Sequence, residues 1–170
     1  MSSITLSSSV DARFEAAPRV TVGDGVGPAE MFALVSAGQR QICIEIRPHG
    51  PQAYPFRDAI LWKGLAVIGY GSALYVVRLE DLHHRAHRFA GYFGSLNCSD
   101  DFCLAAGDDG ILRLSEDGTA LWFQRGLAAD GIRIMEVSDG VIRGQGQWDP
   151  PDGAWTPFRL ELATGRVLTA

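Results

Sequence analysis

The chain of 170 residues contains a single lysine, Lys63, and no run of basic residues. Its net charge is −5 and its isoelectric point is about 5.3. A general nucleic-acid binder needs a basic stripe that displaces counterions from phosphates, so we expect no nucleic-acid partner. The sequence also lacks both a run of about 18 apolar residues and the basic start and apolar core of a signal peptide. We therefore expect no membrane association and a cytoplasmic location.

Cysteine is scarce as well. Cys43, Cys98 and Cys103 are an odd number and too few for a disulfide scaffold, which agrees with a reducing compartment. Cys98 and Cys103 have neither the two-residue spacing nor the second pair of a zinc site. We therefore interpret Cys103 as a buried core residue and assign no special role to the others.

Helical signals are weak, and one short pattern recurs instead. Four segments share an apolar run, a glycine and then an alternating strand with one charge. The four glycines are Gly38, Gly71, Gly107 and Gly146. Such self-similarity marks a repeat architecture, because one supersecondary unit cannot bury its apolar face alone.

Period-two alternation explains how one charge fits into each apolar strand, since successive side chains point to opposite faces. In the first copy Ile44 and Ile46 are expected on the packed face, and Glu45 is expected to face water or a groove between units. The equivalent charged residues of the later copies are Arg78, Arg113 and Arg159.

Dense turn signals join these strands. Four segments supply the residues that adopt the positive backbone angles of tight hairpins. They are Asp108–Gly110, Glu116–Gly118, Ser138–Gly140 and Thr164–Gly165. The pattern predicts short antiparallel strands connected by hairpins.

These features predict a single all-β domain of antiparallel repeat units over residues 20–170. The units are expected at about 20–58, 59–95, 96–131 and 132–170. Residues 1–19 are expected to be a frayed tail or a latch strand. In the latch hypothesis, the alternating segment Ile4 to Val10 pairs with the strand that ends at Val167 and Leu168.

The hairpin from Phe158 to Leu168 resembles the strand, Thr-Gly turn and strand of β-propeller repeat proteins of the PQQ-like or WD-like type. Leu114 to Phe123 looks like the same element, with Trp122 in its closing strand, and Leu79 to Phe89 is a degenerate example. The resemblance implies a small or partial β-propeller-like architecture over Asp58 to the end. Nothing matches the quinone-binding residues of that family, so no cofactor is expected.

Four units leave strand edges and end faces of the array uncovered. Three solutions are open at this point: a closed small propeller, a homodimer that completes a larger ring, or an open curved array capped by the tails.

One histidine-rich segment is a weak candidate for metal binding. His83, His84 and His87 form an HHxxH pattern whose imidazoles could bind zinc or iron, with His49 or Asp81 as a fourth ligand. Because the segment aligns with hairpin turns in the other copies, we favour an exposed polar turn and expect no metal.

The fourth copy carries an insertion rich in tryptophan and proline. Its candidate partner-binding residues are Trp148, Pro150, Pro151, Asp152 and Trp155. Insertions in repeat proteins map to loops on one face, often the binding face, and tryptophan is enriched at binding hot spots. The alternative is that both tryptophans cover the end of the sheet core.

No catalytic motif stands out. There is no G-x-S-x-G elbow, and three of the four histidines cluster on one polar segment. We therefore predict a non-catalytic protein-binding β-repeat module whose partner is another protein or a second copy of itself. One alternative is an enzyme, or a small-ligand or metal-binding protein, with a site at the centre of the strand array. Another is a small acidic toxin-neutralising (immunity-type) or regulatory partner.

Overall fold

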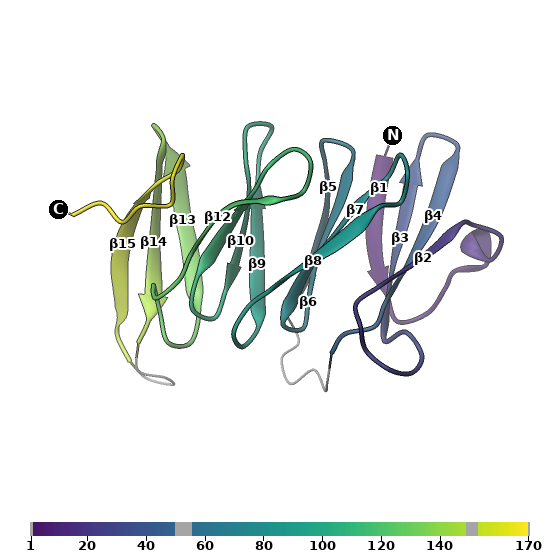
Figure 1. The fold of residues 1–170 in the computed structure, drawn as a ribbon, viewed down its shortest axis with the longest axis horizontal. Helices are drawn as coiled ribbons and strands as arrows, with labels where there is room; N and C mark the ends of the chain where they lie inside the picture. Colours follow the sequence, from purple (N-terminus) through teal and green to yellow (C-terminus); the bar gives the residue numbers. More distant parts are fainter. Residues whose placement is uncertain (1, 50–55, 149–152, 170) are drawn as a thin grey trace.

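The computed structural model describes residues 2–49, 56–148 and 153–169. In these residues the fold is all-β, as predicted, with four sheets that lie in a row (Figure 1). The described helical structure is the short 3-10 helix η1 (Ala12–Phe14). In the described part of the chain, no helix is long and apolar enough to cross a membrane.

The four sheets follow one another along the chain. Sheet A has the order β1-β3-β4-β2, from β1 (Ser2–Ser7), β2 (Arg19–Val22), β3 (Met31–Ala37) and β4 (Arg40–Ile46). Sheet B runs β5 (Arg57–Trp62), β6 (Leu65–Tyr70), β7 (Ala73–Arg78) and β8 (His84–Arg88). Sheet C runs β9 (Phe93–Cys98), β10 (Cys103–Gly107), β11 (Ile111–Leu114) and β12 (Ala120–Gln124). Sheet D contains β13 (Ile132–Ser138), β14 (Val141–Gln147) and β15 (Trp155–Glu161). Neighbouring strands are antiparallel except β2 and β4, which are parallel.

Three apolar clusters fill the spaces between successive sheets. Ile44 and Ile46 of sheet A meet Ile68 of sheet B in the first cluster. Val67 of sheet B belongs to the second cluster, between sheets B and C, and Leu104 belongs to the third, between sheets C and D. The core is therefore divided into layers, each shared by two neighbouring sheets.

This layering explains the two kinds of strand in the sequence. Sheet B is covered on both faces, so Val67 and Ile68 are both fully buried although they point in opposite directions. Sheet D packs on one face alone, so buried Ile142 alternates with the half-buried Val141 and Arg143. Continuous apolar runs thus belong to sheets that are covered on both faces, and the alternating strand β14 belongs to sheet D, which packs on one face.

The predicted hairpin turns show one difference from expectation. Gly118, Gly140 and Gly165 have the positive φ that tight turns require. Gly110 does not, and its role is close approach: a Cβ there would lie 2.5 Å from the backbone oxygen of Gln124 in the edge strand β12. A side chain at position 110 would therefore push β12 away from the turn.

Bonds from side chains to backbone oxygens join each sheet to the next. Arg40 of sheet A donates to Leu79 O at 2.5 Å, and Trp62 of sheet B donates to Ser99 O at 2.6 Å. A third bond joins sheets C and D, where Arg113 Nη1 donates to a backbone oxygen in the turn after β15, that of Leu162, at 2.9 Å. The predicted position of Arg113, facing the gap between units, is consistent with this bond.

The latch hypothesis was wrong. Residues Ser2 to Ser7 form β1, which pairs with β3 inside sheet A, so Ile4 lies opposite Val35. Val167 instead bridges Leu160 of its own sheet D. Sheet A, which contains β1, and sheet D, which contains Val167, lie at opposite ends of the row (Figure 1), which places the two segments too far apart for the proposed pairing.

The two ends of the row differ. The outer face of sheet A is covered by the segment around η1, whose Phe14 packs on Leu34 and Cys43. The outer face of sheet D has no such cover in the described residues, and its side chains are largely polar. The described residues thus form an open row that its own N-terminal segment caps at one end. The homodimer considered from the sequence stays a prediction.

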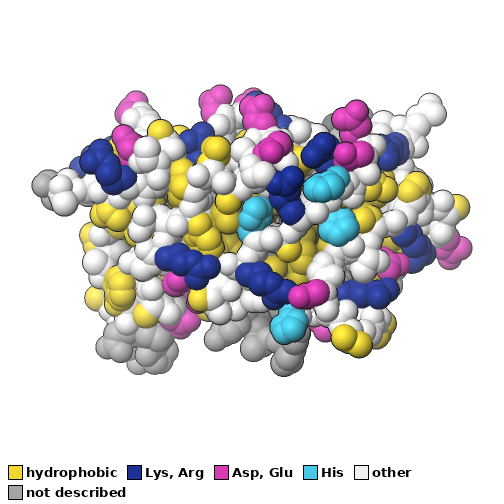
Figure 2. Space-filling view, in the orientation of Figure 1, with side chains coloured by type: hydrophobic (Ala, Val, Ile, Leu, Met, Phe, Trp, Pro, Cys, Tyr) yellow, Lys and Arg dark blue, Asp and Glu magenta, His cyan; other side chains and the backbone are white. Residues whose placement is uncertain are grey.

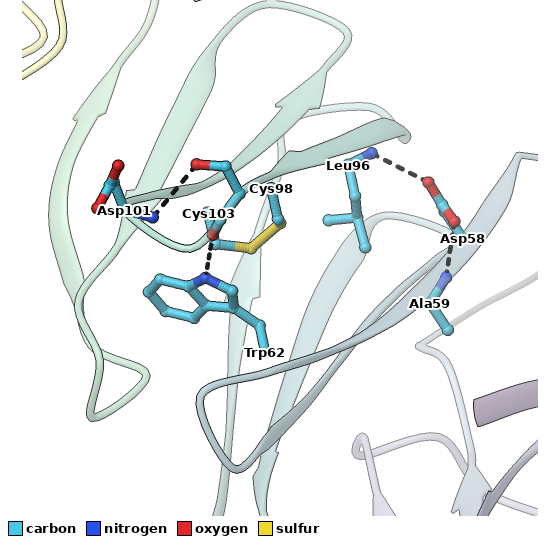
Figure 3. Close-up of a disulfide and its surroundings, with 8 residues drawn as sticks. Asp58, Ala59, Trp62, Leu96, Cys98, Asp101 and Cys103 are labelled. Atoms are coloured by element: carbon cyan, nitrogen blue, oxygen red, sulfur yellow. Dashed lines mark hydrogen bonds between the residues drawn. A yellow bond between two sulfur atoms is a disulfide. The ribbon is translucent and has the colours of Figure 1, made fainter. Parts of the chain in front are cut away.

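Cys98 and Cys103 form a disulfide between the directly opposed strands β9 and β10. Figure 3 shows the indole of Trp62, from sheet B, beside this pair. The expectation that these two cysteines stay reduced was therefore wrong, because the tight turn between the strands brings them into register. Such pairs are typical of oxidising compartments. The cytoplasmic location remains a prediction, and the disulfide weighs against it.

Thiol titration tests the pairing. In denaturant without reductant we expect one reactive thiol for each chain, that of Cys43, which is free and buried. Reduction is expected to lower the free energy of unfolding by about 2 kcal/mol, because the small loop is no longer closed in the unfolded chain. Replacing Cys43 by serine gives the matched control with no reactive thiol. Three reactive thiols in the unreduced protein would contradict the disulfide.

Candidate functional site

The histidine segment is an edge strand and not the predicted turn. His84 and His87 lie in β8, where a separation of three residues places their side chains on opposite faces of the strand. His87 Nε2 is 3.0 Å from the backbone oxygen of Gly118 in the neighbouring sheet, and His83 is exposed before the strand. Over residues 2–49, 56–148 and 153–169, no three His, Cys, Asp or Glu side chains are grouped to hold a metal ion.

The tryptophan-rich insertion is described only at its two ends. Trp148 follows β14 and is 51% exposed, and Trp155 begins β15 and is half-buried. Pro150, Pro151 and Asp152 lie outside the described residues. Trp155 lies directly opposite Gln147 of β14, so the two residues share one face of sheet D. Gln147 follows the buried Gly146, and successive residues of a strand point to opposite faces. Trp155 therefore does not cover the core face of sheet D.

A groove of about 680 Å³ surrounds the first half of β13, between sheets C and D. We call it the β13 groove and define it by six of its lining residues: Phe56, Tyr92, Asp130, Arg133, Met135 and Trp155. Gly94 and Gly107 form part of its wall in sheet C and present no side chain there. The groove therefore combines aromatic, aliphatic and charged side chains from segments that are distant in the sequence.

A β-bulge shapes this groove. Ile134 pairs with Gly144 and Glu136 pairs with Arg143, so Met135 is the extra residue of the bulge. Its side chain is 65% exposed. Bulges commonly turn one side chain out of the regular pattern, and methionine adapts its shape to different partners. The bulge thus presents a flexible apolar side chain at the groove.

The aromatic side chains of the groove are held in place by specific contacts. Phe56 and Tyr92 stack with their ring centroids 5.4 Å apart. The Tyr92 hydroxyl donates to Asp130 Oδ1 at 3.2 Å. The Arg133 guanidinium lies 4.0 Å from the centroid of the Trp155 ring. The groove is therefore lined by positioned rings, which lowers the entropy cost of binding.

Sequence reasoning found one residue of this groove, Trp155, and missed the others. Phe56 and Tyr92 belong to different units and carry no shared motif. The signal that could have identified Met135 is its place in IRIMEVS, where Ile132 and Ile134 alternate with Arg133 and Glu136 then breaks the period. That break in alternation is what a bulge produces.

Comparisons with known proteins identify no family. No family model matches the chain, and no curated protein matches it. Among solved structures, a computationally designed protein, Ika8, is similar at 15% sequence identity and a TM-score of 0.48. The match covers 81% of this chain and 45% of the designed one, so the chain spans less than half of that protein's length. At this level of similarity we infer neither fold nor function from it.

Proposed function

We propose that the protein is a non-catalytic binding module that docks a segment of a partner protein in the β13 groove. The observation that supports this most strongly is the exposed apolar set at the groove, with Met135 65% and Phe56 44% exposed beside Trp155. Exposed apolar groups gathered at one place mark interaction sites, and aromatic residues dominate binding energy at interfaces. A regulatory or toxin-neutralising role would use the same surface.

A protein segment suits this groove better than a small molecule. Small-molecule sites bury most of the ligand surface in a concave pocket. Here Met135 and Phe56 stay substantially exposed, and the groove follows the first half of β13. The interior of the row, where a central site was the alternative prediction, holds the three apolar clusters, whereas the β13 groove opens at the surface.

Strand addition at the outer edge of sheet D is disfavoured. Arg159 O accepts from Leu168 N, and Glu161 N donates to Arg166 O, so the odd residues of β15 direct their backbone groups outward. By the same period Pro157 also faces outward, and proline has no N–H to donate. Proline at this position is a common protection of edge strands. The partner is therefore expected to bind side chains of the sheet and not its edge.

A selection from a displayed library of random peptides tests the proposal. We expect the immobilised protein to enrich peptides that the double variant Met135→Ser/Trp155→Ala binds at least about tenfold more weakly, because it lacks the two apolar anchors. Leu121→Ser is the matched control, since Leu121 is 55% exposed on β12, outside the groove. Failure to enrich any peptide over the double variant would reject the proposal.

Self-association is tested by the mass in solution. A monomer of 18.4 kDa is expected, because the N-terminal segment already covers the outer face of sheet A. A dimer that Met135→Ser/Trp155→Ala converts into a monomer would identify a second copy as the occupant of the groove.

A further inference from the structure

The outer face of sheet D carries an unfavourable arrangement of charge. Arg143 and Arg159 are directly opposed in the pairing of β14 with β15, so both side chains lie on the same face. Like charges directly opposite each other in a sheet are destabilising. Local rules that are broken without a gain in folding tend to be found at functional sites. The opposed arginines are therefore better explained by binding than by the stability of the fold.

Arg133 extends this surface toward the β13 groove. It lies on the same face of sheet D, opposite Gln145, and its guanidinium stacks on Trp155 of the groove. We call Arg133, Arg143 and Arg159 the arginine face. The arginine face and the groove are continuous, because Arg133 belongs to both.

The carboxylates on this face leave two of the arginines unpaired. Glu136 is 3.5 Å from Arg143, and Glu161 is 3.8 Å from Arg166 in the C-terminal segment. In the part of the chain that the structure describes, neither Arg133 nor Arg159 has a carboxylate within ion-pair distance. Both have forked donors available for a carboxylate from outside.

Building on the proposed function, we propose that the partner segment is acidic, with carboxylates that bind the arginine face beside an apolar side chain in the β13 groove. The charges are complementary, because Arg133 and Arg159 lie on one face of sheet D and neither has a carboxylate within ion-pair distance among the described residues. A nucleic-acid backbone fits less well, since Glu136 and Glu161 interrupt the arginines, and phosphate tracks need a continuous basic stripe. Acidic and basic side chains are also interspersed on the side of the molecule that faces the reader in Figure 2.

Charge reversal on the arginine face tests this inference with the same peptide library. The unmodified protein is expected to select peptides rich in Asp and Glu next to an apolar residue, and their binding is expected to weaken with added salt. Arg159→Glu is expected to reduce that binding by roughly tenfold or more, since charge-assisted hydrogen bonds are lost. The same variant is expected to raise the midpoint of urea unfolding, because Arg143 then faces a carboxylate.

Arg85→Glu is the matched control, because it makes the same change of charge on β8 of sheet B. It is expected to leave peptide binding unchanged. Enriched peptides without acidic residues, or acidic peptides whose binding Arg159→Glu leaves intact, would overturn the inference while the proposed function stands. Binding of a duplex DNA probe that Arg159→Glu abolishes would also overturn it. No enrichment over Met135→Ser/Trp155→Ala would reject the proposed function itself.

Discussion

Replacing Phe93 by alanine is expected to lower the free energy of unfolding by about 3–5 kcal/mol, because the fully buried ring fills the layer between sheets B and C. The ring lies against Gly69 of β6, where an added Cβ would come within 2.1–2.3 Å of three ring atoms. Gly69→Ala alone is therefore expected to destabilise the protein by about 1–3 kcal/mol through overpacking. Urea unfolding followed by tryptophan fluorescence measures both effects.

The double variant Gly69→Ala/Phe93→Ala tests whether the two residues are in direct contact or whether their effects on the free energy of unfolding are independent. Once Phe93 is alanine, the methyl group at position 69 enters the cavity. Alanine also loses less backbone entropy than glycine when the strand folds. Gly69→Ala is then expected to be neutral or stabilising, which corresponds to a coupling of about 1 kcal/mol or more. Phe93→Leu gives a smaller cavity in case the alanine variant does not fold. Additive effects would contradict direct contact between the two residues.

Phe14→Ala is expected to destabilise the protein by about 3 kcal/mol and to uncover the outer face of sheet A. Phe14 is buried against Leu34 and Cys43. Burial raises the pKa of the Cys43 thiol, although nearby Arg19 acts against that rise. Removing the ring is expected to lower the pKa and to speed the reaction of Cys43 with a thiol reagent under native conditions.

Arg13→Ala is the matched control for Phe14→Ala, since its exposed side chain pairs only with neighbouring Asp11 among the described residues. Exposed ion pairs contribute little, so a change below about 1 kcal/mol is expected, with no change in the reactivity of Cys43. Unchanged stability and reactivity in Phe14→Ala would show that the N-terminal segment does not cap the row.

The repeat could be predicted from the sequence because it depends on local rules. The alternation around Glu45 fixed which side chains share a face, and the glycines at 118, 140 and 165 fixed hairpin turns. Glu45 is paired with Arg19 at 2.8 Å, and this bond holds the pKa of its carboxyl below the usual value. The predicted outward position of Glu45 is consistent with that surface pair.

Most of the candidate site could not be predicted in this way. Phe56, Tyr92 and Met135 are far apart in the sequence, and they meet because sheets B, C and D lie next to one another. The opposed Arg143 and Arg159 depend on the register of β14 with β15. A shift of one residue in that register would place one of them on the core face.

The sequence by itself determined the all-β class, the recurring unit and the turns, since backbone sterics and period-two alternation act over a few residues. Tertiary structure decided the rest: the pairing of β1 with β3, the Cys98–Cys103 disulfide, the capped and uncapped ends of the row, and the β13 groove. These features depend on which edges and faces remain available once the sheets have packed, and that choice is made by contacts between residues distant in the chain.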